Sequence, residues 1–214
     1  MRDRSNTQAS AALPRNWPAH LPYLTAPRYS PHLTAAHMAG IRTRPDPSDP
    51  IPEIPRHLKP GPCPAVCITP ITDQNQKDPA HGQAGLFATR DLRPGELILP
   101  YLGEVHIGTA PFGLSRTHTD KDGGDDYDYA KSDYDLWLDR DADVAVDAAR
   151  MGNEARFVND YRGVPRAKRA NAEFRVVWDA RMGERCMAVY VLPAGKRAVG
   201  KARVVGIAKG EEIL

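Results

Sequence analysis

The chain has 214 residues, of which 41% are hydrophobic and 26% are charged, and its net charge is +2. This composition is ordinary for a globular protein, and the length allows one domain with a real core. No apolar run approaches the ~20 residues of a membrane span and no secretory signal is evident, so we expect a location in the cytoplasm or nucleus. Three cysteines are too few for a disulfide framework or a four-thiolate zinc site. The spacing of Cys63 and Cys67 is compatible with a metal pair, but we interpret it as a loop and expect no metal site.

Proline dominates the first part of the chain, since fifteen of the 20 prolines lie within the first 80 residues. Proline removes a backbone donor and disfavours helix in the residue before it, so we expect residues 1–65 to form a Pro-rich, partly disordered arm and linker. Disordered tails are usually poor in aromatic residues, and we therefore expect Trp17 and Tyr23 to pack on the domain that follows. The alternative, disorder of everything before about residue 65, stays open.

Two segments within this arm have their own signals. Residues Pro31–Arg42 are compatible with a short helix that has Ser30 as its N-cap and Gly40 near its end. The segment Asp46–Pro64 is interpreted as a linker.

A folded domain is expected over residues 66–214. Short apolar or alternating runs separated by turn residues predict a mainly β domain with few short helices. The strand signals are Cys67–Thr69, the turn and strand His81–Ala88, Glu96–Gly103, Tyr134–Asp139, Val144–Asp147, and a hairpin of Ala172–Trp178 with Cys186–Leu192.

Charge is unevenly distributed along this domain. Thr109–Asp147 holds eleven aspartates against four basic residues, whereas fourteen basic residues lie between Arg150 and Lys209 against five acids. The acidic loop, centred on residues 120–135, is either a solvated insertion or a rim that attracts a Lys/Arg-rich peptide by electrostatic steering. The basic clusters are too short and turn-like to support direct nucleic-acid binding, which we do not expect.

The segment Asp147–Gly163, DAARMGNEARFVNDYRG, is difficult to explain as plain core or plain surface. An apolar step at Phe157-Val158 stands in a polar setting, and the turn-forming run that follows cannot continue a helix. Such a segment suits the presentation of a side-chain amide and backbone groups to a polar ligand. An ordinary loop with a local Asx turn is the alternative.

The same segment resembles the signature of SET-domain protein methyltransferases, a phrase that closes on Arg-Phe-x-Asn-His-Ser-Cys-x-Pro-Asn. Asp160 stands in place of the family's His and Tyr161 in place of its Ser, and the first Gly of the family's Gly-x-Gly turn falls at Gln83. The matching residues are Asp147-Ala148, Gly152-Asn153, Ala155-Arg156-Phe157, Asn159, Gly85–Ala88, Pro94–Glu96, Tyr101–Glu104 and Lys209–Leu214. The chain is most similar to small fungal-type SET proteins without Cys-rich flanks. The family's next Tyr would follow Leu214, so we expect a SET domain over 66–214 that is incomplete at its C-terminus.

The resemblance implies an architecture of several small sheets, β-clip-like, around a threaded C-terminal segment. It also implies a protein-lysine N-methyltransferase, monomeric, that uses S-adenosylmethionine and acts on a histone or another Lys/Arg-rich protein. The cofactor site implied by the motifs comprises Gln83, Ala84, Gly85, Leu86, Arg156, Phe157, Asn159 and Asp160.

The catalytic residues implied are Tyr134 and Tyr161, which would line the lysine channel, with Tyr101 as a further candidate. Two alternatives remain. One is a catalytically inactive SET-like interaction module, which the replacement of the family's His by Asp160 favours. The other is a truncated reading frame of an active enzyme.

Overall fold

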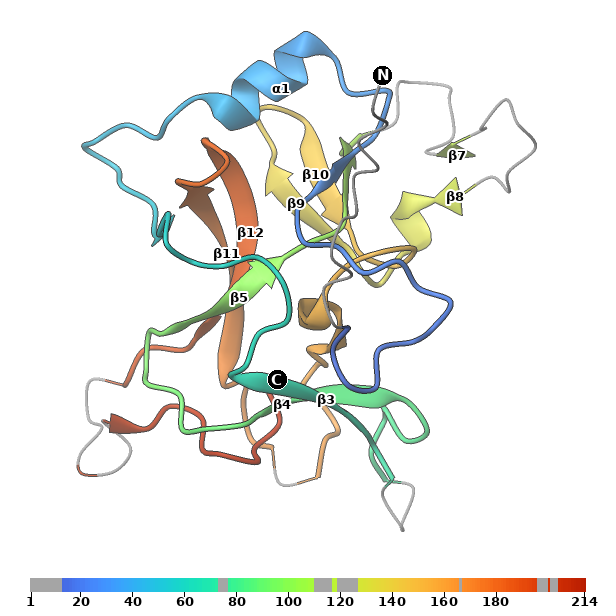
Figure 1. The fold of residues 1–214 in the computed structure, drawn as a ribbon, viewed down its shortest axis with the longest axis vertical. Coiled ribbons are helices and arrows are strands. Elements are labelled where there is room, and N and C mark those ends of the chain that lie inside the picture. Colours follow the sequence, from blue (N-terminus) through green and yellow to red (C-terminus); the bar gives the residue numbers. More distant parts are fainter. Residues whose placement is uncertain are drawn as a thin grey trace, which may run out of the picture.

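The computed structural model describes residues 13–72, 77–109, 117–118, 127–165, 167–195, 200 and 204–214. Within these residues the chain forms short strands gathered into small sheets, with a single α-helix (Figure 1). The mainly β fold class predicted from the sequence is therefore confirmed. Residues 120–126 of the acidic loop lie outside the described residues, so the role of this loop stays a prediction.

The first sheet has the strand order β1-β6-β10-β9. Its strands are β1 (Arg28–Tyr29), β6 (Glu104–Ile107), β10 (Val144–Asp147) and β9 (Asp135–Asp139). The pairing of β1 with β6 is parallel, and the other pairs are antiparallel. All four residues of β10 are buried, as expected for a central strand rich in valine.

The second sheet has the order β2-β11-β12-β5. It comprises β2 (Glu53–Ile54), β11 (Ala172–Asp179), β12 (Glu184–Val191) and β5 (Leu97–Tyr101). The predicted hairpin is confirmed, because β11 and β12 pair along their whole lengths. At its turn Gly183 has a φ of 71°, a left-handed conformation that glycine adopts without steric strain. The chain leaves this sheet at the end of β5 and enters the first sheet at β6, so the two sheets meet there.

The remaining elements are short. A hairpin of β3 (Val66–Pro70) and β4 (Ala84–Ala88) covers one end of the molecule, while β7 (Thr117–His118) pairs with β8 (Tyr127–Asp128). Two 3-10 turns, η1 (Tyr129–Lys131) and η2 (Glu154–Phe157), follow β8 and β10. The last described segment, 204–214, lies beside β4: the Ile213 amide donates to the Leu86 carbonyl at 2.8 Å.

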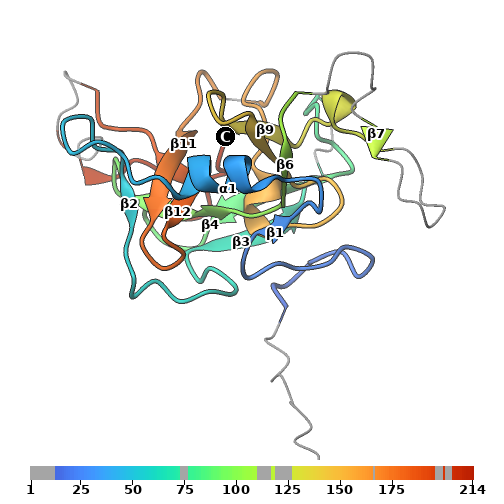
Figure 2. The same ribbon diagram turned by 90° about the horizontal axis from the view of Figure 1, so that it is seen from above.

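The arm before residue 66 packs on these sheets. Trp17 is buried and meets the rings of Tyr23 and Phe157 edge-on, at centroid distances of 5.0 and 5.8 Å, as expected for the arm aromatics. The helix α1 (Ala35–Arg42) runs across the ends of both sheets (Figures 1 and 2). Its Gly40 lies against Ala142, in the turn between β9 and β10.

Two details of the arm differ from the sequence prediction. The N-cap of α1 is Thr34, whose hydroxyl accepts from the His37 amide, and not Ser30. The segment Asp46–Pro64 is not a free linker, because β2 pairs in parallel with β11 and Ile54 is 0% exposed. The sequence did not predict this strand, because two residues in a proline-rich segment carry almost no strand signal, although two residues are enough to pair at a sheet edge.

A buried carboxylate fastens the arm to the sheets. Glu154, 2% exposed, accepts hydrogen bonds from the Tyr23 hydroxyl at 3.0 Å and from the Cys63 amide at 2.8 Å. Replacing Glu154 with Ala leaves both donors unpaired, and we expect a loss of about 2–4 kcal/mol in the free energy of unfolding. Denaturant titration measures it, with the exposed Glu53→Ala as the control. An equal, small loss in both variants would contradict the assignment.

Candidate functional site

A pocket of about 570 Å³ lies where the two sheets and the β3–β4 hairpin meet. We call it the junction pocket. It is lined by Gln83, Ala84, Tyr101, Asp133, Tyr134, Leu136, Ala155, Arg156, Phe157, Val158, Asn159, Asp160 and Phe174. The volume is in the range of small-molecule sites, and the lining combines aromatic rings with a few polar groups, as such sites usually do.

The junction pocket brings together seven of the ten site residues predicted from the sequence: Gln83, Ala84, Tyr134, Arg156, Phe157, Asn159 and Asp160. Gly85 and Leu86 do not line it. Leu86 is fully buried in the core, and Gly85 lies against the side chain of Glu212. Tyr161 lines a second cavity of about 270 Å³, which shares the wall Val158–Asp160 and Phe174 with the junction pocket.

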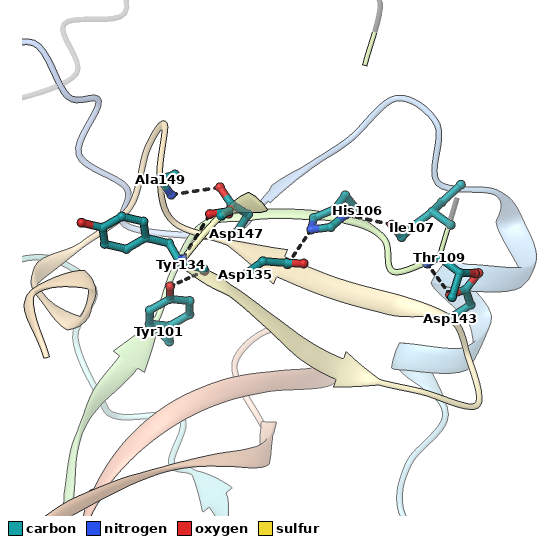
Figure 3. A network of polar contacts seen from close by, with 10 residues as sticks. Tyr101, His106, Ile107, Thr109, Tyr134, Asp135, Asp143, Asp147 and Ala149 are labelled. Carbon is teal, nitrogen blue, oxygen red and sulfur yellow. Dashed lines mark hydrogen bonds and ion pairs between the residues drawn. The ribbon is translucent and has the colours of Figure 1, made fainter. Parts of the chain in front are cut away.

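Tyr134 is held by its backbone. Its carbonyl accepts from the Tyr101 hydroxyl at 2.6 Å and from the Ala148 amide at 3.2 Å, and its amide donates to the Ser132 hydroxyl at 3.1 Å. Figure 3 shows the Tyr134 ring pointing away from this polar network, while the Tyr101 hydroxyl meets the Tyr134 backbone. The Tyr134 backbone is therefore fixed, and its hydroxyl makes no hydrogen bond to another described residue.

Asp147 anchors the same network from β10. Its buried carboxylate accepts from the Ser132 hydroxyl and from the Ala149 amide. Burial, together with the nearby Asp147 charge, raises the pKa of the Tyr101 phenol well above its usual value. Tyr101 therefore stays a protonated hydrogen-bond donor to Tyr134 throughout the neutral range.

Arg156 forms one wall of the pocket. Its Nε donates to the Ala148 carbonyl at 2.9 Å, and its guanidinium lies 4.5 Å from the Tyr134 ring centroid and 5.0 Å from that of Phe157. A planar cation between two rings both packs and orients them. The Arg-Phe step that the sequence singled out is therefore a rigid part of the wall.

Asn159 and Asp160 behave differently. The Asn159 amide nitrogen donates to Glu212 Oε1 at 3.0 Å and to the Ala84 carbonyl at 3.4 Å. The Asp160 carboxylate pairs with the exposed Arg162 guanidinium at 2.6 Å, and hydrogen bonds from the Arg162 backbone and side chain hold the pKa of Asp160 below its usual value. The Asn159 side chain is thus held by two hydrogen bonds within the fold, whereas Asp160 lies at the exposed rim of the pocket.

A family model described as SET domain matches residues 83–214. The chain belongs to the SET-domain family. No match is found among the curated proteins. The match covers more than half of the chain and includes every residue that lines the junction pocket.

Solved structures similar to this SET domain include polycomb repressive complex 2 of Chaetomium thermophilum. A crystal structure of that complex is 23% identical over 70% of this chain and 15% of that chain, with a TM-score of 0.42. The same complex in an autoinhibited conformation bound to S-adenosylmethionine is 22% identical, with a TM-score of 0.42, over 70% of this chain and 14% of that chain. The chain therefore spans about one seventh of the length of these relatives.

Sequence reasoning missed several residues of this SET-domain site. Phe174 is 37% exposed on β11 and packs edge-on against Tyr101 at 5.3 Å between centroids. An exposed aromatic within a hairpin strand carries no signal of its own, so only the sheet geometry reveals its place. Glu212 belongs to the Lys-Gly-Glu-Glu phrase that carried the resemblance, yet its contact with Asn159 joins residues 53 positions apart. The other unpredicted lining residues are Asp133, Leu136 and Ala155.

The cysteine pair shows no metal geometry. Cys63 Sγ approaches the Ile98 carbonyl at 3.4 Å, Cys67 Sγ lies 3.7 Å from the Thr69 hydroxyl, and burial raises the pKa of the Cys63 thiol. Among the described residues no group of three or more His, Cys, Asp or Glu side chains converges on a point where an ion would fit. In the same part of the chain, none of the helices has the length and apolar character that a bilayer crossing requires.

Proposed function

We propose that this SET domain is an S-adenosylmethionine-dependent protein-lysine N-methyltransferase whose reaction takes place at the junction pocket. The observation that carries the proposal is that three segments far apart in the chain line one cavity: Tyr134 before β9, the residues Arg156–Asn159 at η2, and Gln83-Ala84 at the start of β4. Each had been expected at a donor or lysine site from the family pattern alone. Their meeting in space is independent support, since the pattern does not specify distances.

The residues of the pocket fit such a cofactor. S-adenosylmethionine carries a cationic sulfonium, an ammonium, a carboxylate and an adenosine, so its site needs aromatic faces, acceptor oxygens and space for a small molecule. Phe174 provides an aromatic face, which attracts cations, while the rings of Tyr134 and Phe157 already pack against the Arg156 guanidinium. Asn159, with the backbone of Gln83 and Ala84, provides polar groups. The volume of about 570 Å³ is sufficient for a ligand of this size.

The chemistry asks little covalent help from the protein. When bound, the cofactor would supply a methyl group on a sulfonium sulfur, which an uncharged lysine amine would accept by in-line displacement; the N–C bond forms as the S–C bond breaks, giving a methylammonium and a neutral thioether. What the chain must contribute is alignment. The hydrogen bonds of Tyr134 hold its backbone, and the Arg156 guanidinium packs against its ring. The same guanidinium disfavours the charged form of an amine placed beside that ring, because like charges repel.

The substrate is proposed to be a Lys/Arg-rich peptide, such as a histone tail. The acidic Asp133 lies at the pocket, and opposite charges steer a basic peptide toward it. Action as a monomer in the nucleus or cytoplasm is part of the same proposal. The 214-residue chain itself is the species to test.

A second candidate function is a non-catalytic SET module that binds a basic partner. The observation favouring it is Asp160, which takes the place of the family's His and is engaged at the rim by Arg162. Such a module would bind a peptide without transferring a methyl group.

Titration of the chain with S-adenosylmethionine in a calorimeter, followed by transfer of a labelled methyl group to lysine-rich peptides, separates these functions. We expect saturable binding at one site and label on lysine. Binding of the cofactor without transfer to any histone-tail peptide would favour the non-catalytic module. A folded sample that binds no cofactor would overturn the proposed enzyme.

A further inference from the structure

Glu212 lies behind the junction pocket. We propose that Glu212 is a positioning residue for the methyl donor: it holds the Asn159 amide with its oxygen available to the donor's ammonium group, and it places an uncompensated negative charge behind that contact. The inference rests on the proposed function, because the donor is the cofactor named there.

The orientation of the Asn159 amide follows from its partners. Glu212 Oε1, at 3.0 Å, and the Ala84 carbonyl, at 3.4 Å, both act as acceptors toward Asn159 Nδ2. An amide nitrogen has two hydrogens, so both are used. A flipped amide would face two acceptors with its oxygen, and repulsion excludes it. The Asn159 oxygen makes no hydrogen bond within the described part of the chain and is left to accept one from a ligand.

The Glu212 carboxylate belongs to a segment whose backbone is held by hydrogen bonds. The Glu212 carbonyl accepts from Asn171 Nδ2 at 2.7 Å, and the neighbouring Ile213 amide donates to Leu86 at 2.8 Å. Gly85 makes room for the side chain, since a Cβ at this position would lie 2.4 Å from Glu212 Oε1. The glycine expected to pass close to a ligand thus lies against the Glu212 side chain.

The charge of Glu212 has no counter-ion among the described residues. Burial raises the pKa of Glu212, the nearby Asp78 charge raises it further, and the Asn159 hydrogen bond lowers it. The Asp78 carboxylate is itself buried and accepts from the Ala80 amide at 2.9 Å. Half-buried carboxylates without a cation are unfavourable in a fold, and a ligand with two positive groups would relieve this one.

The test compares Glu212→Gln with Glu211→Gln. Both variants lose one negative charge at adjacent positions, but the exposed Glu211 carboxylate binds only the Ala208 amide among the described residues. By calorimetry we expect Glu212→Gln to weaken S-adenosylmethionine binding about tenfold, as befits a lost charge contact. Glu211→Gln should change it less than twofold.

A second probe separates positioning from general disruption. 5′-Methylthioadenosine lacks the amino-acid end and the sulfonium charge, so Glu212→Gln should bind it as well as the wild-type chain does. Gly85→Ala, which displaces the Glu212 carboxylate, should repeat this selective loss. Lowering the pH through the raised pKa of Glu212 should weaken S-adenosylmethionine binding to the wild-type chain more than to Glu212→Gln.

Thermal unfolding gives a second measurement, in which Glu212→Gln is expected to keep or raise stability although it weakens binding of S-adenosylmethionine. Because the folded-state pKa of Glu212 lies above its unfolded value, its stabilising contribution is present at low pH and is lost as pH rises through the folded pKa. At neutral pH the Gln variant should therefore unfold at the wild-type temperature or above it. If Glu212→Gln lowered the unfolding temperature and weakened the binding of S-adenosylmethionine and 5′-methylthioadenosine equally, Glu212 would be a structural residue only.

The two proposals fail separately. Wild-type binding of S-adenosylmethionine that Glu212→Gln leaves unchanged overturns the role of Glu212 alone. A folded wild-type chain that binds no donor overturns both.

Discussion

Replacement of Asn159 with alanine is expected to lower S-adenosylmethionine affinity at least a hundredfold and to abolish methyl transfer. The substitution removes the free amide oxygen from the pocket and also releases the Glu212 carboxylate from its only hydrogen bond to a described side chain. Losing a hydrogen bond to a charged group typically costs more free energy than losing one between neutral groups. Asn159→Ala removes both the hydrogen bond to the Glu212 carboxylate and the oxygen offered to the ligand. Calorimetric titration and a labelled-methyl assay measure the two effects.

The stability of Asn159→Ala distinguishes a lost site from a lost fold. Asn159 contributes two hydrogen bonds at a half-buried position, so the free energy of unfolding should fall by only about 1–2 kcal/mol. Asn16→Ala serves as the control: it removes an amide hydrogen bond to the Ile68 carbonyl at 2.8 Å outside the pocket and, at a φ of 64°, also adds backbone strain, so its loss of stability should be at least as large. Donor binding retained by Asn159→Ala, or lost equally in Asn16→Ala, would contradict the assignment.

Gly103→Ala is expected to be among the most destabilising substitutions in the chain, lowering the free energy of unfolding by about 3 kcal/mol or more. A Cβ at Gly103 would lie 2.1 Å from the Asp147 carbonyl oxygen and 2.6 Å from its carbon. These are backbone atoms of the central strand β10, which cannot move aside without breaking its ladder. The shift would also disturb Tyr134, whose carbonyl accepts from the Ala148 amide.

Denaturant unfolding of Gly103→Ala checks this, with Gly195→Ala as the matched control. An added Cβ at Gly195 meets nothing within 4 Å, and Gly195 does not have a positive φ, so that variant should be nearly neutral. If both substitutions cost less than about 1 kcal/mol, the close approach of β6 and β10 at this point is wrong.

Local pattern was sufficient for most of the strands. Val144–Asp147 and the β11–β12 hairpin were predicted close to their observed bounds. Alternating or β-branched runs between turn residues rarely form anything other than strands. Where the pattern is weak it failed: β2 has two residues in a proline-rich segment, and Thr34 rather than Ser30 caps α1. Whether such short elements form depends on tertiary contacts, as for β2, which exists because it pairs with β11.

The site divides in the same way. The sequence identified Asn159 and the Arg156-Phe157 step as candidates, because their segment fits neither plain core nor plain surface and matches the family's pattern. The resemblance alone added Tyr134. It did not identify Phe174 or Glu212, and it assigned Gly85 to the cofactor although the structure places this glycine against Glu212.

The sequence by itself therefore determined the mainly β fold class, most of the strands and the residue types of the site. Only the tertiary structure decided which of those residues meet. Tyr101 reaches Tyr134 across 33 positions and Glu212 reaches Asn159 across 53, and Glu154 fastens an arm that precedes it by 131. Propensity and periodicity act over a few neighbouring residues, whereas these contacts exist because separate sheets bury their apolar faces together and bring distant polar groups within hydrogen-bond distance.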